Sequence, residues 1–314
     1  VGVVMKRLAR CVLLLVAWPV SALATPDLES RPRSVPIVLD GHLDEADWQL
    51  TPTSEHFVER TPTPDGQPPV RTVLKVLHDA EALYLGIRLE HPPGHVPRAY
   101  ELHRDSFSIW ADDTITLKFD VRLDRRNTVG FAFNSRGTQL DYVSLENGSI
   151  FRREYDAVWE VATARFADHW VAEVRLPAAA LGIPSRPGEQ RMGLNVARDY
   201  TPLSATYYWA PIPPELSPNP PQRYGTLRGV RGMGGGRPLS LRPYALGGWQ
   251  WTPEERSEWR GRGGATVAMR LGEDSWGELT ALTDFAEVDV DPAVLNLTRF
   301  PIFLPERRPF FLSG

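Results

Sequence analysis

Residues 37–48 read Ile-Val-Leu-Asp-Gly-His-Leu-Asp-Glu-Ala-Asp-Trp, an apolar run followed by a glycine turn and an acidic segment that ends in tryptophan. This order predicts a β-strand, a tight turn at Asp40 and Gly41, and then a short helical turn. Asp44 is the expected N-cap of the helical turn, because its carboxylate can accept hydrogen bonds from free backbone N–H groups. Trp48 is expected to point back into the core. A turn and a buried aromatic need no ligand, so the stretch by itself indicates structure.

The chain that follows has the pattern of a β-protein as far as about Val230. Short runs of alternating apolar and polar residues, or of β-branched and aromatic residues, are separated by clusters of Gly, Pro, Asn and Asp. This spacing predicts an all-β fold, an antiparallel β-sandwich. With 29 prolines and 25 glycines, long helices are not expected, and residues 177–181 have the pattern of a short helix. The expected β-hairpins pair residues 70–77 with 83–89, 114–121 with 129–134, and 159–166 with 169–176.

Proline and glycine mark the end of the predicted sandwich. Residues 211–221 contain six prolines, so they cannot form a central strand and are expected to form a long surface loop. Residues 224–229 are then the last strand, and residues 232–237 follow as a glycine-rich joint between two domains. The sandwich domain is therefore predicted to span residues 36–231, and residues 25–35 are predicted to form a polar linker in front of it.

Six segments of this region, taken in order, resemble carbohydrate-binding module family 9. The resemblance covers roughly residues 35–231, and as an ordered series it is specific. It implies a family 9 or DOMON-like β-sandwich that binds an oligosaccharide or a polysaccharide. The segments read VLDGHLDEADW (38–48), LKVLHDAEALYLGIRLE (74–90), WADDTITLKFD (110–120), GFAFNSRGTQLDY (130–142), HWVAEVRLPAAALGI (169–183) and MGLNVARD (192–199).

Sugar contacts are sought among the aromatic residues, because an aromatic ring can stack on the apolar face of a pyranose. The chain has ten tryptophans, and Trp48, Trp159 and Trp170 lie in strand or turn contexts where burial is the ordinary outcome. Trp110 lies in a polar loop before a strand, where an aromatic side chain is expected to be exposed. Two interpretations follow: Trp110 is a stacking platform for a sugar, or it packs within its loop.

The resemblance to family 9 sharpens the choice of site residues. In the sugar-binding members a sugar lies between two tryptophans, and Trp110 matches the first of them. The second falls near Pro218, so Tyr208 or Trp209 would have to replace it. Asn134 is retained as a candidate sugar contact, although it can equally serve the turn that follows it. The acidic and the basic contact of the family align with Thr116 and Ala132.

Four aspartates, Asp112, Asp113, Asp120 and Asp124, supply hard oxygen ligands near one end of the predicted sheet. Calcium accompanies family 9 modules, so the resemblance implies a structural Ca²⁺ at these residues. A solvated acidic surface is the alternative interpretation. No other cofactor is expected.

An enzymatic role would need more than the sequence offers. Glycoside hydrolysis requires two carboxylates that face each other across a cleft. Neighbouring residues of a strand point to opposite faces, so Asp112 and Asp113 cannot both face one substrate. We therefore expect a non-catalytic chain that is linked to hydrolases only by family association. The candidate pairs are Asp112 with Asp113, Asp44 with Asp47, and Glu160 with Glu173.

The first residues indicate export. Residues 1–24 combine basic residues, an apolar stretch too short to span a bilayer and a small-x-small cleavage site, which is the pattern of a signal peptide. The single cysteine, Cys11, lies within it, so the exported chain is expected to contain neither disulfides nor thiolate metal sites. A net charge of −4 makes nucleic acid a poor partner. The expected location is the periplasm or the outer membrane.

Beyond residue 237 the pattern changes. Residues 239–251, 265–271 and 277–285 each alternate between apolar and polar positions, which is typical of either a second soluble sheet or an outer-membrane β-barrel. Residues 282–311 resemble the family 5916 domain of unknown function, in which a large barrel follows a family 9 module. Residues 238–314 are therefore expected to be the first strands of an incomplete β-barrel that contacts the outer membrane, because three strands cannot close a barrel.

Together these predictions describe an exported, non-catalytic chain that binds a glycan of xylan or cellulose type and takes part in its uptake at the outer membrane. Two alternatives remain open. The sandwich is a plug or interaction domain of the barrel without sugar affinity, or it is an accessory part of a glycoside hydrolase system.

Overall fold

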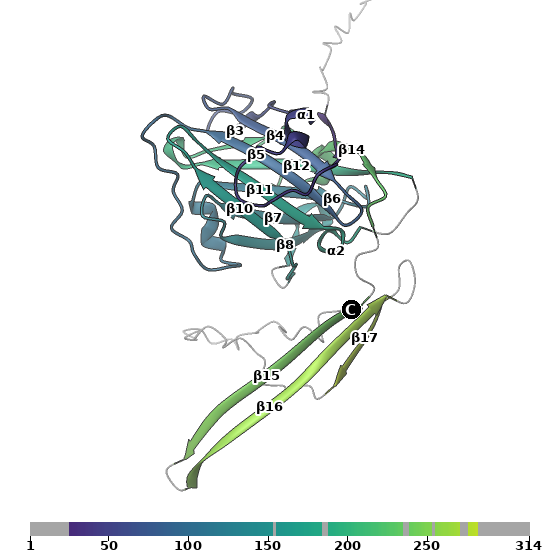
Figure 1. The fold of residues 1–314 in the computed structure, drawn as a ribbon. Helices are drawn as coiled ribbons and strands as arrows, with labels where there is room; N and C mark the ends of the chain where they lie inside the picture. Colours follow the sequence, from purple (N-terminus) through teal and green to yellow (C-terminus); the bar gives the residue numbers. More distant parts are fainter. Residues whose placement is uncertain are drawn as a thin grey trace, which may run out of the picture.

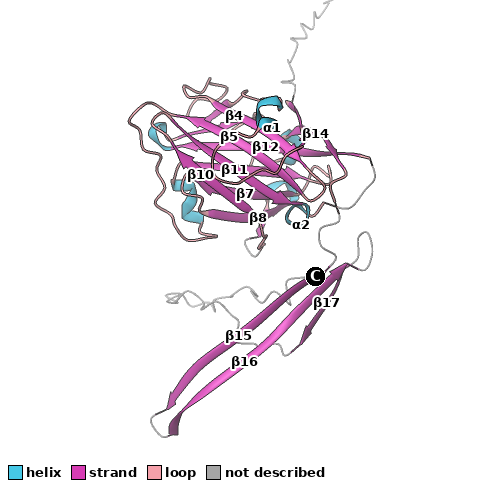
Figure 2. Cartoon of the chain, viewed as in Figure 1, coloured by secondary structure: helices cyan, strands magenta, loops and turns pink. Residues whose placement is uncertain are grey.

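A computed structural model describes residues 25–152, 155–183, 188–234, 239–252, 255–270 and 276–281. The predicted signal peptide and the segment that resembles the family 5916 domain lie outside the described residues. Figures 1 and 2 show that most of the described chain forms two layers of β-strands with a few short helices. No helix in the described part is long or apolar enough to cross a lipid bilayer.

The larger sheet has nine strands. They are β1 (Asp27–Glu29), β3 (Val58–Thr61), β6 (Thr114–Asp120), β7 (Thr128–Asn134), β8 (Gln139–Leu145), β9 (Ile150–Arg152), β12 (Glu189–Tyr200), β13 (Ala205–Tyr208) and β14 (Gly225–Arg231). The main path runs β1-β14-β12-β6-β7-β8-β9, and β13 joins β12 to β3 beside it. All of these pairs are antiparallel except that of β1 with β14.

The smaller sheet has five strands in the order β10-β11-β5-β4-β2. Its strands are β2 (Arg31–Pro32), β4 (Thr72–His78), β5 (Ala82–Glu90), β10 (Glu160–Arg165) and β11 (His169–Pro177). The helices of the described chain are α1 (Ala46–Leu50), α2 (Ala178–Leu181) and the 3-10 turns η1 (Phe107–Ala111), η2 (Glu146–Gly148), η3 (Thr201–Leu203) and η4 (Pro221–Arg223).

The antiparallel sandwich predicted from the sequence is confirmed, including its three hairpins. β4 pairs with β5, β6 with β7, and β10 with β11. Helix α2 begins after Pro177 and ends at Gly182, whose φ of 65° is the left-handed conformation that favours glycine at a helix end. The last strand of the sandwich, β14, lies where the sequence predicts it.

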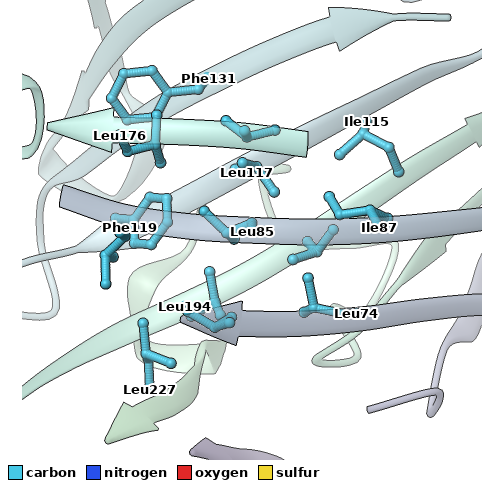
Figure 3. Packing of buried hydrophobic residues seen from close by; sticks show 14 of the residues in the cluster. Leu74, Leu85, Ile87, Ile115, Leu117, Phe119, Phe131, Leu176, Leu194 and Leu227 are labelled. Atoms are coloured by element: carbon cyan, nitrogen blue, oxygen red, sulfur yellow. The ribbon is translucent and has the colours of Figure 1, made fainter. Parts of the chain in front are cut away.

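The main core lies between the two sheets. Strand β6 contributes Ile115, Leu117 and Phe119 at alternate positions, and β5 contributes Leu85 and Ile87 from the opposite sheet. All five side chains are fully buried. Figure 3 shows them meeting between the strands of the two layers. Because burial of each such side chain is worth roughly 1.5–3 kcal/mol, this layer accounts for the association of the two sheets.

The segment of residues 37–48 packs across the outer face of the smaller sheet. Trp48 is fully buried there against Leu77 and Tyr84, in a cluster separate from the main core. Trp159 and Trp170, by contrast, lie in the main core. The burial predicted for the three tryptophans is confirmed, although Trp48 is buried on the other side of its sheet.

Glu173 of β11 holds this segment in place. Its carboxylate accepts hydrogen bonds from the backbone N–H groups of Asp40 and Gly41, each at 3.0 Å, and from Nε1 of Trp48 at 3.2 Å. Gly41 has a φ of 86°, and a Cβ atom there would lie 2.5 Å from the backbone nitrogen of Ala164. The predicted turn is therefore confirmed, and it requires glycine because β10 lies directly beneath it.

Three expectations for the first part of the chain are wrong. Residues 37–39 form no strand, because side-chain carboxylates and not a strand edge bind the backbone of this segment. Helix α1 has Glu45 at its N-cap position, so Asp44 does not cap it. Residues 25–35 form β1 and β2, which extend the two sheets by parallel pairing, where a polar linker is predicted. Edge strands need only backbone groups, so a polar composition does not exclude them.

Strands β15 (Leu239–Thr252), β16 (Glu255–Arg270) and β17 (Trp276–Ala281) form a separate antiparallel sheet (Figure 1). They overlap the three segments in which the sequence predicts alternation. Leu241, Val267 and Leu279 are cross-strand neighbours on one face, and Leu241 and Leu279 are 62 % and 72 % exposed. Closure into a barrel stays a prediction, since residues 282–314 lie outside the described part of the chain.

Candidate functional site

The outer face of the larger sheet is polar and nevertheless buried. The outward residues of β6 are Thr114, Thr116, Lys118 and Asp120, and each is at most 3 % exposed. Two loops contact this face. One ends in η1 and reaches Thr116, and the other is the proline-rich loop of residues 211–221, which reaches Lys118. The candidate site lies where these loops meet the sheet.

Four aromatic side chains form what we call the aromatic cluster: Phe107 and Trp110 of η1, Tyr142 of β8 and Phe151 of β9. Phe151 stacks on Tyr142 with ring centroids 4.4 Å apart and an interplanar angle of 22°. The Trp110 ring lies 5.1 Å from Phe107, 6.1 Å from Tyr142 and 6.3 Å from Phe151. Tyr142 is buried, Phe107 and Trp110 are half-buried, and Phe151 is 37 % exposed. The cluster therefore presents aromatic surface to solvent on a buried base.

The sheet is shaped to hold this cluster. Gly130 lies opposite Tyr142 in the register of β7 and β8, and a Cβ atom at Gly130 would lie 2.1 Å from the Tyr142 ring. Nε1 of Trp110 donates to Oγ1 of Thr116 at 3.2 Å, and the Tyr142 hydroxyl donates to Oδ1 of Asn219 at 3.1 Å. These contacts tie η1 and the proline-rich loop to the same patch of the sheet.

The structure brings together the positions that the resemblance to family 9 aligns with sugar contacts. Thr116 accepts a hydrogen bond from Nε1 of Trp110, and Ala132 is fully buried in a hydrophobic group with Tyr142, against which Trp110 packs. Tyr142 and Phe151 are members of the cluster that the sequence does not predict. A signal for Tyr142 exists in the glycine at position 130, which leaves room for a large ring on the neighbouring strand, but only the strand register identifies that ring.

Three of the predicted sugar contacts have other roles. Trp209 is fully buried in the main core. Tyr208 is 3 % exposed beneath the proline-rich loop, where its hydroxyl accepts a hydrogen bond from Nζ of Lys118 at 3.2 Å. Asn134 is fully buried, and its Oδ1 accepts from two backbone N–H groups of the turn that follows it. Among the predicted sugar contacts, Trp110 is therefore the one with partly exposed surface.

A buried cation binds the proline-rich loop to the sheet. Nζ of Lys118 donates to the carbonyl oxygen of Pro218 at 2.8 Å and lies 4.7 Å from the centroid of the Tyr208 ring. Burial lowers the pKa of Lys118 to about 7, although the charge of Asp199 opposes this shift. Burial also raises the pKa of Asp199, which two threonine hydroxyls oppose by donating hydrogen bonds to it. Burial beneath the loop therefore disfavours both the positive charge of Lys118 and the negative charge of Asp199.

The four aspartates predicted to bind Ca²⁺ are not brought together. Asp112 and Asp113 precede β6 and accept hydrogen bonds from backbone N–H groups of residues 98–101. Asp120 ends β6 and, with Asp124, accepts from the backbone of the next turn. The two pairs thus lie at opposite ends of one strand and stabilise loops. No group of three or more His, Cys, Asp or Glu side chains in the described ranges could hold a metal ion.

The predicted carboxylate pairs lie away from two hollows of the described chain. The described chain has a hollow of about 330 Å³ beside the proline-rich loop and another of about 590 Å³ beside the turn between β7 and β8. Neither is lined by a residue of the three pairs. Glu173 is occupied by three N–H donors, and Glu160 pairs with Arg175 at 2.8 Å. The protein itself therefore supplies the partners of Glu160 and Glu173.

Comparison with known proteins is informative for the fold. No family model and no curated protein matches the sequence. The chain is similar to a candidate carbohydrate-binding protein from Bacteroides uniformis, with a TM-score of 0.53 and 15 % identity, over 65 % of this chain and 99 % of that chain. The chain is also similar to a family 9 carbohydrate-binding module from Caldicellulosiruptor kristjanssonii, with a TM-score of 0.46 and 15 % identity in both its cellotriose and its glucose complex. Those matches cover 68 % of this chain and 95 % or 97 % of the module. At this identity the first likeness concerns the sandwich fold alone.

Proposed function

We propose that this chain is a non-catalytic carbohydrate-binding protein whose ligand stacks on the aromatic cluster. The observation that carries the proposal is the partly exposed surface of Trp110 and Phe151, supported from below by buried Tyr142. A platform whose rings are already packed loses little conformational entropy when a ligand binds. The likeness of the fold to a candidate carbohydrate-binding protein supports the same function.

We infer further that the ligand is a glycan of xylan or cellulose type and that the chain acts at the outer membrane. The glycan class rests on the resemblance of residues 35–231 to family 9. Export is supported by the signal pattern of residues 1–24. Membrane association is supported by the sheet of β15–β17, because Leu241 and Leu279 leave one of its faces apolar and exposed.

Isothermal titration calorimetry with xylo- and cello-oligosaccharides tests the binding function. We expect the wild-type chain to bind and Trp110→Ala and Phe151→Ala each to weaken binding by at least about tenfold, the equivalent of ~1.4 kcal/mol of lost stacking. Phe166→Ala is the matched control. Phe166 is 38 % exposed, close to the 37 % of Phe151, but it stacks on His169 of the smaller sheet.

Thermal melts of the same variants separate lost binding from lost folding, since Trp110 also packs on its neighbours. Trp110→Phe keeps an aromatic ring and is expected to retain part of the affinity. Absence of binding by the wild-type chain to either oligosaccharide series refutes the proposal, as does equal affinity of Phe151→Ala and Phe166→Ala.

One observation favours a second function, an interaction domain without sugar affinity. The proline-rich loop occupies the polar face of the larger sheet, where Lys118 and Tyr142 bind it at Pro218 and Asn219. A face that is closed by the chain itself has less surface for a sugar. A wild-type chain that melts cooperatively but binds no oligosaccharide would support this function over the first.

A further inference from the structure

A polar hollow of about 590 Å³ lies beside the turn between β7 and β8. Ser135, Arg136 and Thr138 of the turn form one wall, and Thr163 and Arg165 of β10 form another. The walls belong to different sheets, so the hollow opens at the margin of the sandwich. It is shallow and widely open to solvent, so a ligand there would be contacted on one side and not enclosed.

Arg165 is fixed in this hollow with most of its donors unused. Its Nε donates to the carbonyl oxygen of Ser135 at 2.9 Å, and a terminal nitrogen donates to Oγ of the same residue at 2.8 Å. A guanidinium group carries five N–H donors, so the remaining three have no protein partner within the described residues. Two bonds to one residue set the plane of the guanidinium group and leave it available to a ligand.

Arg136 adds a second positive charge. Its side chain is exposed, and it makes no hydrogen bond or ion pair with any described residue. Burial and then repulsion by Arg136 lower the pKa of Arg165, and the charge of Asp113 offsets only part of this effect. The hollow therefore holds two cations whose mutual repulsion Asp113 offsets only in part. An anion placed between them would relieve their repulsion.

We propose that this hollow binds the carboxylate of a uronic acid residue, so that the glycan recognised by the chain is acidic. The inference deepens the proposed carbohydrate binding and rests on it. Arginine suits this role because its planar fork matches a carboxylate in two parallel hydrogen bonds. The hydroxyls of Thr138 and Thr163 donate to backbone carbonyls and keep lone pairs that accept from sugar hydroxyls. Leu102, 63 % exposed at the rim, offers apolar contact to the sugar ring.

The hollow and the aromatic cluster border the same loop, residues 101–111. Leu102 lines the hollow, and Phe107 and Trp110 follow a few residues later in η1. Thr138 anchors the start of this loop by donating to the carbonyl oxygen of Glu101 at 2.9 Å. A glycan that occupies both sites would follow this loop from the aromatic cluster to the two arginines.

Titration of the full chain with glucuronate, glucose and inorganic phosphate tests the inference, with binding followed by NMR. We expect glucuronate to bind more tightly than glucose or phosphate. Arg136→Gln is expected to weaken glucuronate binding by about tenfold or more, because one charge-assisted contact is lost. Arg122→Gln is the matched control, since it removes the same charge from an exposed side chain at the turn before β7. Arg136 is exposed, so its replacement is not expected to impair folding.

Equal affinity of the wild-type chain and Arg136→Gln for glucuronate overturns the inference. Phosphate that binds as tightly as glucuronate also overturns it, since the hollow would then be a general anion site. Neutral oligosaccharides distinguish this inference from the proposed function. If glucuronate binds and neutral oligosaccharides do not, the proposed stacking on the aromatic cluster is refuted and the carboxylate site is supported. If neutral oligosaccharides bind and glucuronate does not, the carboxylate site is refuted and the stacking is supported.

Discussion

Replacing Glu173 by glutamine removes the carboxyl group that holds residues 37–48 against the smaller sheet. The side chain is fully buried, and one of its oxygens accepts the backbone N–H groups of Asp40 and Gly41 while the other accepts Nε1 of Trp48. A glutamine can keep its amide oxygen on the two backbone groups. Its amide nitrogen then faces the indole N–H, so one hydrogen bond is lost, at a cost of roughly 1–3 kcal/mol.

The main effect of Glu173→Gln is expected in the pH dependence of stability. Burial raises the pKa of Glu173 from 4.5 to about 7, and the charge of Glu45 adds to this, although hydrogen bonds to the carboxylate oppose it. The folded chain therefore binds this proton more tightly than the unfolded chain does. The resulting stabilisation is fully present below about pH 4.5 and is lost as the pH rises through about 7. At ~1.4 kcal/mol per pKa unit, the wild-type chain is expected to lose about 2.5 kcal/mol between about pH 5 and about pH 8.

Urea unfolding followed by tryptophan fluorescence at several pH values in this range measures the effect. The unfolding free energy of Glu173→Gln is expected to fall less with pH than that of the wild-type chain, by about 2.5 kcal/mol over the range. Glu160→Gln on the neighbouring strand is the control, because its exposed carboxyl group pairs with Arg175 at the surface. It is expected to keep the wild-type slope. Identical slopes for the wild-type chain and Glu173→Gln would refute the reasoning.

Two further predictions concern stability. Gly41→Ala is expected to lower the unfolding free energy by about 2–4 kcal/mol, because the added methyl group meets the backbone of Ala164 in addition to the strain of a positive φ. Gly94→Ala has a similar φ but open space around it and is expected to cost only about 1–2 kcal/mol, so equal melting temperatures would contradict the role of the contact. The unfolding free energy of the wild-type chain is expected to rise with pH between about 7 and 10.5, and Lys118→Met is expected to remove this rise. The pKa of Lys118 falls from 10.5 to about 7 on folding, so the unfolded chain binds more protons between these values and the wild-type chain gains stability across them. Urea unfolding at about pH 7 and about pH 9 measures the slope, and a methionine variant that keeps it contradicts the shift.

The strands of the sandwich could be predicted because their signals are local. Alternation places Ile115, Leu117 and Phe119 on one face of β6, and the turn residues on either side of it define the hairpin. The partial exposure of Trp110 could likewise be predicted, since the polar residues of its loop are visible in the sequence. The contact of Phe151 with this loop could not be predicted, because Phe151 reaches the loop only through the pairing of β8 with β9.

The sequence by itself determined the all-β class of this protein, its hairpins, the glycine turn at position 41 and the burial of its tryptophans at 48, 159 and 170, because alternation, turn chemistry and large apolar surface act over a few residues. Only the tertiary structure decided that residues 37–48 lie over a sheet and do not join it, that the polar face of β6 is covered, and that Arg136 and Arg165 meet at one hollow. These features depend on which distant segments share a face. Local propensity carries no information about such contacts, since they form between residues whose neighbourhood is set by sheet order and register.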